Sequence, residues 1–301
     1  MELGADSPRA AQSAVVSRAG AVRRFAQTAR RNSRCLLTLV LLLANGPWVH
    51  AATLTKASTS RSDRKQAIDE MPLAQLTPDA RARIQQVIEK PTMFRRMPIH
   101  EVDCDPKLHR FLIRYPEVVV NIWQLMGITK VSADRVGPYV FNASDGVGTV
   151  TKVELIYGDQ DTHLLYCEGK YEGPLFQKPL TGRCVLLLKA GYKEDANERF
   201  HISNRLDVFL QIDNVAIDAV TRTLHPLVGK SADLNFVQTT DFLEKISRTS
   251  EENGTGMQRL AQRLENVDPQ IRDQFSQLTQ EIHTNAQGRV ARLSAAQAVP
   301  R

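Results

Sequence analysis

Apolar and polar residues alternate along residues 200–212, and this alternation predicts a β-strand with one face on a core. The apolar face carries Phe200, Ile202, Leu206, Val208, Leu210 and Ile212, while the polar face carries His201, Ser203, Arg205, Asp207 and Gln211. Shorter extended runs bounded by turn residues precede it, at 128–133, 139–142, 149–157, 163–171 and 184–188. We therefore expect an antiparallel sheet in the middle of the chain.

Apolar residues recur every three or four positions on either side of these strands, which predicts helices. They are expected over 77–90 and over 105–126, the second broken at Pro116. A long final helix is expected over 213–248, with a kink at Pro226.

A first strand at 94–103, two helices, about six to seven antiparallel strands and a long final helix give an α+β fold. We predict that residues 77–250 form this single domain. The element order resembles the helix-grip fold of START-type and related ligand-binding domains, over roughly residues 94–248. The resemblance implies that the sheet wraps around the kinked final helix and that a ligand binds between them.

Three stretches of sequence are also similar to an uncharacterised family of exported planctomycete proteins. They are Arg114-Tyr115-Pro116-Glu117 through Trp123-Gln124-Leu125-Met126, then Gly173-Pro174-Leu175-Phe176, and Leu224-His225-Pro226-Leu227-Val228-Gly229-Lys230. No activity is carried over from that family. The similarity implies only a secreted protein with a single domain.

The segments on both sides of the domain are predicted to be flexible. Residues 52–76 are rich in Ser, Thr and charged residues, so they are expected to be a disordered linker. Residues 251–301 are expected to hold a flexible link at 253–256 and a helical tail with an apolar stripe, formed by Leu260, Leu264, Val267, Ile271, Phe275, Leu278 and Ile282. The stripe is buried either on the domain or on another subunit, which makes residues 257–286 a candidate surface for self-association.

Residues 1–51 have the organisation of a secretory signal peptide. Seven arginines precede an apolar run at 35–44, and a helix-breaking Asn45-Gly46-Pro47 then leads to small residues. The run is about half as long as the roughly 20 residues that a bilayer-spanning helix needs. We therefore predict export to the periplasm, the cell envelope or the medium, with no permanent membrane span after cleavage. Retention by an uncleaved N-terminal anchor is the alternative.

Cleavage of this segment changes the charge balance. Seven of the 39 basic residues and two of the 33 acidic residues lie within it, which leaves 32 basic and 31 acidic side chains. The basicity that would favour nucleic acid as a partner belongs mainly to the signal. No nucleic-acid partner is therefore predicted.

Three cysteines remain after cleavage: Cys104, Cys167 and Cys184. An oxidising compartment allows one internal disulfide among them. Cys167 and Cys184 are the favoured pair, because both lie on predicted strands that are close in sequence. Three free thiols are the alternative.

Candidate ligand-binding residues follow from the helix-grip resemblance. The aromatic residues expected around the space between sheet and final helix are Trp123, Tyr139, Phe141, Tyr166, Phe209 and Phe236. His225 at the expected kink would be a polar anchor. His201, Arg205 and Asp207 share a strand face, which makes them candidates for an acid, a base or an anion anchor. Charge pairing on a solvated sheet face is the alternative.

No motif for a metal, a cofactor or a catalytic nucleophile stands out. Asp159-x-Asp161-x-His163 places three potential ligands on alternate positions, but the glycine and glutamate of a calcium loop are missing from the register. A second polar cluster spans 100–109, where Asp105 has the simpler role of a helix cap. Neither a metal nor a cofactor is predicted.

The leading hypothesis is an exported, non-catalytic protein that binds a lipid or another hydrophobic small molecule between the sheet and the final helix. It rests on analogy of fold. An enzyme on the same scaffold, with His201, Arg205, Asp207 or His225 in acid–base chemistry, is the first alternative. An envelope interaction protein with no ligand pocket is the second.

Overall fold

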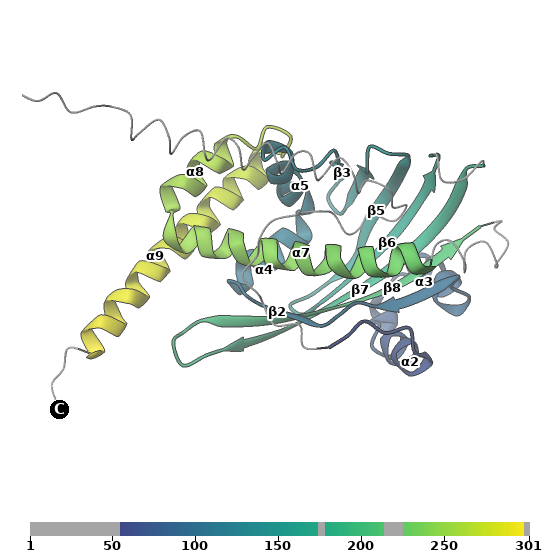
Figure 1. Cartoon of the computed structure of the whole chain (residues 1–301), viewed down its shortest axis with the longest axis horizontal. Helices are drawn as coiled ribbons and strands as arrows, with labels where there is room; N and C mark the ends of the chain where they lie inside the picture. The colour runs from purple at the N-terminus through teal and green to yellow at the C-terminus, as the bar shows by residue number, and fades with distance from the viewer. Residues whose placement is uncertain (1–54, 174–177, 214–224, 298–301) are drawn as a thin grey trace, which may run out of the picture.

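The computed structural model describes residues 55–173, 178–213 and 225–297 (Figure 1). The strands are β1 (Met93–Arg96), β2 (His100–Asp103), β3 (Ser132–Gly137), β4 (Val140–Ser144), β5 (Thr149–Gly158), β6 (Thr162–Tyr171), β7 (Leu180–Glu194) and β8 (Phe200–Ile212). The helices are α2 (Arg61–Asp69), the 3-10 turn η1 (Leu73–Gln75), α3 (Pro78–Glu89), α4 (Pro106–Arg114), α5 (Pro116–Leu125), α7 (His225–Glu252), α8 (Gly254–Gln262) and α9 (Pro269–Gln297). The predicted signal peptide at 1–51 lies outside the described residues.

The strands form one open antiparallel sheet in the order β1-β8-β7-β6-β5-β4-β3. β2 also pairs with β8, so the first predicted strand is divided into two pieces that follow each other along β8. Figure 1 shows α7 lying across the sheet. The predicted α+β class and the helix-grip-like layout, with an antiparallel sheet and a long C-terminal helix, are confirmed.

The start of the predicted final helix, residues 214–224, lies outside the described residues. α7 begins at His225 and continues to Glu252, four residues beyond the predicted end near 248. The predicted kink at Pro226 stays a prediction.

Local chemistry explains why α4 and α5 are separate helices. The carboxylate of Asp105 accepts hydrogen bonds from the backbone N–H groups of Lys107 and Leu108, at 2.8 and 3.0 Å, and so caps α4. Pro106 and Pro116 occupy the first positions of the two helices, where the missing N–H of proline costs no hydrogen bond. The cap and the two prolines therefore fix where each of the two helices begins.

Both faces of the sheet are covered. We call the face under α7 the inner face; there, strand residues such as Leu186 and Val208 share a core with Phe236 of α7. We call the opposite face the outer face; there, Phe209 and Val185 share a core with Ile84 of α3. An outer face closed by N-terminal helices was not predicted.

The expectation that residues 52–76 are a disordered linker is corrected for the part that the structure describes. Residues 61–69 form α2, and Ala67, Met71 and Leu76 are buried in the outer core with α3. The side chain of Ser60 accepts a hydrogen bond from the N–H of Asp63 and caps α2. A few apolar residues and a network of charged contacts are enough to order a segment of polar composition.

The C-terminal segment is helical, as predicted, but residues 253–256 are not a flexible link. Asn253 caps α8 by accepting from the N–H of Gly256, and a Cβ on Gly254 would meet the His283 ring at 2.8 Å. The apolar stripe packs within the chain, in a helical layer that we define by the shared core of α4, α5, α7, α8 and α9. Residues Leu264 and Phe275 of the stripe are fully buried there.

Candidate functional site

The structure brings two of the six predicted aromatic residues together on the inner face. Phe141 and Phe236 share the core under α7. The other four lie elsewhere: Trp123 packs on Phe242 in the helical layer, Tyr166 and Phe209 belong to the outer core, and Tyr139 is 64% exposed. Tyr166 and Phe209 sit on the outer face because neighbouring strand residues point to opposite faces.

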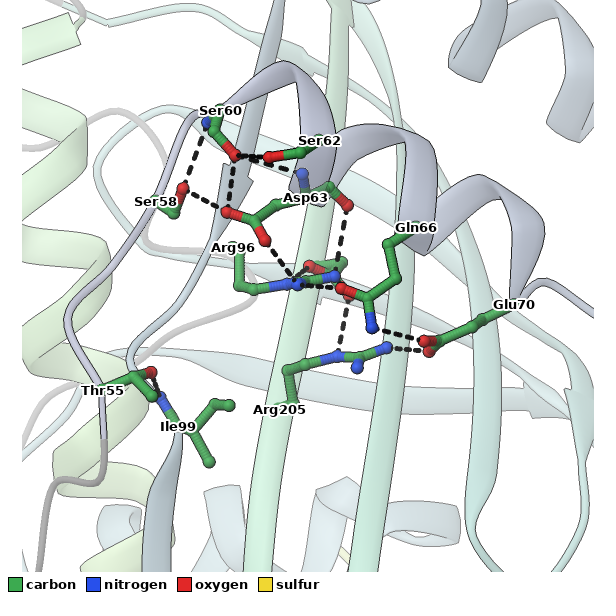
Figure 2. A network of polar contacts seen from close by, with 11 residues as sticks. Thr55, Ser58, Ser60, Ser62, Asp63, Gln66, Glu70, Arg96, Ile99 and Arg205 are labelled. Carbon is green, nitrogen blue, oxygen red and sulfur yellow. Dashed lines mark hydrogen bonds and ion pairs between the residues drawn. The ribbon is translucent and has the colours of Figure 1, made fainter.

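The polar residues Arg205 and Asp207 belong to a charged network on the outer face (Figure 2). Arg96 Nε donates to Asp207 Oδ1 over 2.6 Å, and its Nη1 donates to Asp63 Oδ1 of α2 over 2.9 Å. Arg205 Nε donates to Asp207 Oδ2 over 3.2 Å, and its Nη2 donates to Glu70. The network therefore joins β1 and β8 to α2.

Burial and charge act in opposite directions within this network. Burial raises the pKa of the Asp207 carboxyl, against the lowering effect of Arg96 and Arg205. Burial lowers the pKa of Arg96, but its hydrogen bond to Asp207 and the nearby carboxylates outweigh burial and raise it. Arg96, Arg205 and Asp207 all have partners within the chain, so we interpret the network as the contact that docks α2 rather than as an open anion anchor.

His201 lies apart from that network, at the start of β8. Its Nδ1 is 2.7 Å from Asp103 Oδ1, and its Nε2 is 3.5 Å from Asp195 Oδ2. Burial lowers the pKa of His201, but the two carboxylates outweigh it and raise the pKa. His201 therefore bridges β2 and the β7–β8 turn. His225, the other predicted anchor, begins α7, and its side chain lies outside the described part.

A different set of polar side chains lies on the inner face, under α4 and α7. His109 of α4 is fully buried; its Nε2 lies 2.8 Å from Asn204 Oδ1 and its Nδ1 lies 3.0 Å from the Tyr192 hydroxyl. Because Oδ1 only accepts, Nε2 carries the proton and Nδ1 accepts from Tyr192. Burial lowers the pKa of His109 to about 4, so the ring is neutral near pH 7.

His100 forms a second contact of this kind. Its Nε2 lies 2.6 Å from Asp241 Oδ1, which joins β2 to α7 across the inner face. Both side chains are largely buried. We call His100, His109, Asn204 and Asp241, together with His163, the inner polar cluster.

His163 differs from the rest of the inner polar cluster because neither of its ring nitrogens has a hydrogen-bond partner. The side chain is fully buried on β6, opposite Leu188 of β7. The pKa of His163 is lowered to about 4, mainly by burial and also by the charges of Arg114 and Arg110 on α4, while Asp159 and Asp161 act to raise it. His163 is therefore a neutral imidazole with a free donor and a free acceptor inside the fold.

Partly exposed apolar side chains lie beside His163 on the same face. Leu188 of β7 is the cross-strand partner of His163, and Leu165 follows His163 on the inner face of β6. Leu155 of β5 is in turn the cross-strand partner of Leu165. Phe141 on β4 continues the row, and all four are only half-buried. We call these four residues the inner apolar band. The inner face thus has apolar surface that α7 does not fully cover, with an unpaired polar group at one end.

Sequence reasoning did not identify this site, although a signal was present. His163 was considered with Asp159 and Asp161 as a metal ligand, yet these two aspartates belong to the β5–β6 turn. The more informative pattern is a single histidine in an otherwise apolar strand, followed on the same face by Leu165 and Cys167. A polar residue in that position must be paired or functional.

Other kinds of site receive no support from the described residues. They contain no group of three or more His, Cys, Asp or Glu side chains placed to hold a metal ion. Among them, no helix has the length and apolar character needed to cross a membrane. An open groove of about 370 Å³ lies over β4 to β7, lined by Lys152 and Lys170 but also by Glu168 and Asp213, so its charge favours no particular ligand.

Comparison with known proteins leaves the site to be interpreted from its geometry. No protein-family model matches this chain, and a search of curated proteins finds no match.

Proposed function

We propose that this protein is an exported, non-catalytic binding protein that holds a hydrophobic small molecule on the inner face of its sheet, beside α4 and α7. The observation that carries the proposal is His163, a fully buried imidazole with no partner at either nitrogen. A buried polar group left without a hydrogen bond costs about 1–3 kcal/mol. The free protein would be more stable with an apolar residue at this position. A ligand that hydrogen-bonds His163 would explain why a histidine stands there.

The inner apolar band supports the hydrophobic character of this ligand. Phe141, Leu155, Leu165 and Leu188 stay partly exposed although they face the interior side of the sheet. Ligand sites in proteins combine such apolar walls with a few polar groups that fix orientation. The position between sheet and α7 is also where the helix-grip resemblance places a ligand.

Among the described residues, the predicted acid–base candidates have partners within the chain, which favours binding over catalysis. The predicted acid–base residues Arg205 and Asp207 are occupied with α2, and His201 lies between Asp103 and Asp195. The predicted signal peptide at 1–51 supports the exported location.

A titration with N-phenyl-1-naphthylamine, an uncharged apolar fluorophore, tests the proposal on the full chain purified from an exporting host. We expect saturable binding that Leu165→Arg weakens at least tenfold, since a guanidinium in the inner apolar band would lose its water on ligand binding. Leu165→Trp, which keeps the position apolar but fills the space above it, should weaken binding too and covers the case in which arginine prevents folding. Leu234 is 52% exposed on α7, so Leu234→Arg is the matched control and should bind like the natural protein. No saturable binding, or equal affinity in the Leu165 and Leu234 variants, contradicts the proposal.

A further inference from the structure

The chemistry around His163 also limits what the polar end of the ligand can be. This inference rests on the proposed function, because it concerns the same site. Two other members of the inner polar cluster are already engaged: His109 with Asn204 and Tyr192, and His100 with Asp241. His163 is the member whose two buried ring nitrogens both lack a hydrogen-bond partner.

The charges that act on His163 come in two opposing pairs. Arg110 and Arg114 approach from α4, whereas Asp159 and Asp161 approach from the β5–β6 turn. Arg110 also stacks on the Tyr192 ring at 5.4 Å, and the Arg114 side chain is exposed to solvent. The two pairs therefore oppose each other, and charges of both signs act on the imidazole.

A charged ligand group would be poorly stabilised in these surroundings. A carboxylate placed against a fully buried neutral imidazole would lose its water without gaining a dedicated cation, and an ammonium would lose its water without gaining a dedicated anion. A hydroxyl group fits better, because it both donates and accepts and so satisfies whichever nitrogen of the ring it reaches.

We infer that the ligand is an uncharged apolar alcohol, whose hydroxyl group hydrogen-bonds His163 while its hydrocarbon part lies along Leu188, Leu165, Leu155 and Phe141. His163 is then the residue that selects the head group. The inner apolar band supplies affinity without regard to the head group.

Three probes with the same ten-carbon tail test this inference by isothermal titration calorimetry at about pH 7.5. They are decan-1-ol, decanoate and decylammonium. The full chain should bind decan-1-ol at least tenfold more tightly than either charged probe, and His163→Phe should bring the three affinities within about threefold of one another. His283→Phe makes the same substitution on α9, where the ring contacts the Glu251 carbonyl, and should leave the preference for the alcohol intact.

The outcomes separate this inference from the proposed function. If decanoate or decylammonium binds as tightly as decan-1-ol, the head group has been assigned wrongly while the inner face remains a binding site. If His163→Phe keeps the preference for the alcohol, His163 is not the selecting residue. If no probe binds the natural protein, the proposed function fails along with the head group.

Discussion

Two of the buried histidines of the inner face, His109 and His163, differ in one respect that mutation can measure. His109 has a partner at each nitrogen, whereas His163 has none. His163→Phe removes an unpaired polar group, so it should raise the free energy of unfolding of the ligand-free protein by about 1–2 kcal/mol. His109→Phe leaves Asn204 and Tyr192 without their partner and should lower that free energy by about 1–3 kcal/mol. Urea unfolding of both variants checks the pair, and a loss of stability in His163→Phe would show that its ring is satisfied after all.

Burial of these rings also sets the response to acid. The pKa values of His109 and His163 are lowered to about 4 in the fold, so the unfolded chain binds more protons than the native protein between pH 6.5 and pH 4. Their contribution is fully present above about pH 6.5 and is lost as the pH falls, by roughly 3 kcal/mol for each ring. His201 has a raised pKa and acts in the opposite direction, with its stabilisation present at low pH and lost as the pH rises through its folded pKa.

Urea unfolding at several pH values between 6.5 and 4 measures this acid sensitivity. His163→Phe should reduce the fall in stability by roughly half. An equal fall in the variant and the natural protein would mean that His163 is not buried as a neutral ring.

Asp207 tests the role of the outer network at the same scale. It is fully buried and accepts from Arg96 and Arg205, so Asp207→Ala leaves a buried guanidinium without its carboxylate and should cost about 3–5 kcal/mol. Asp69 pairs with Lys65 on the surface, and Asp69→Ala should cost less than about 1 kcal/mol. Thermal or urea unfolding compares the two variants. Similar costs would contradict the view that the network holds α2 on the sheet.

At the scale of elements, the register of β6 and β7 decides the state of two cysteines. Cys167 and Cys184 are direct cross-strand partners and are free thiols in the structure. In antiparallel sheets, hydrogen-bonded and non-hydrogen-bonded pairs alternate along the strands. The N–H of Ala190 donates to the carbonyl of Asp161, so this pair is hydrogen-bonded, and the cysteine pair, six residues further along the same register, is hydrogen-bonded too. In such pairs the Cβ atoms lie about 5 Å apart or more, whereas a disulfide needs about 3.8 Å.

We therefore predict that the disulfide between Cys167 and Cys184 does not form. The chain without the predicted signal peptide at 1–51, refolded in a glutathione redox buffer, should show three alkylatable thiols after denaturation, from Cys104, Cys167 and Cys184. Burial raises the pKa of Cys167 to about 12, which keeps its thiol unreactive in the fold. A mass two hydrogens lower, with a linked Cys167–Cys184 peptide, would contradict this.

Strands and helices were predictable where the spacing of apolar residues marks a single buried face. The alternation at 200–212 gave β8, because one face of that segment is apolar and the other carries charges. The partners of those charges were not predictable, since Glu70, which accepts from Arg205, and Arg96, which donates to Asp207, both lie more than a hundred residues away in the sequence. The same uncertainty misplaced Phe209, whose apolar surroundings on the outer face come from α3.

The candidate site was less predictable than the fold. Aromatic residues were expected to mark the ligand space, yet the inner apolar band contains leucines and a single aromatic residue, Phe141. Which leucines stay partly exposed depends on where α7 crosses the sheet, and no local pattern encodes that position. The unpaired state of His163 likewise depends on the lack of a partner on α4, which only the assembled structure can show.

At the scale of the whole molecule, the chain surrounds one sheet with helices on both faces, and the two sides have different roles. The outer face is closed by α2 and α3 through a core and a charged network. The inner face joins a packed core under α7 to the inner polar cluster and the inner apolar band. The helical layer buries the stripe on α8 and α9 within the same chain, which is one of the two arrangements that the sequence allowed.

The most direct measurement of the central claim is native mass spectrometry of the full chain purified from an exporting host, with and without added decan-1-ol. We expect a complex that exceeds the mass of the polypeptide by one small molecule, either co-purified or equal to decan-1-ol, and its loss in Leu165→Arg but not in Leu234→Arg. A polypeptide that stays free of any bound molecule under both conditions would contradict the account.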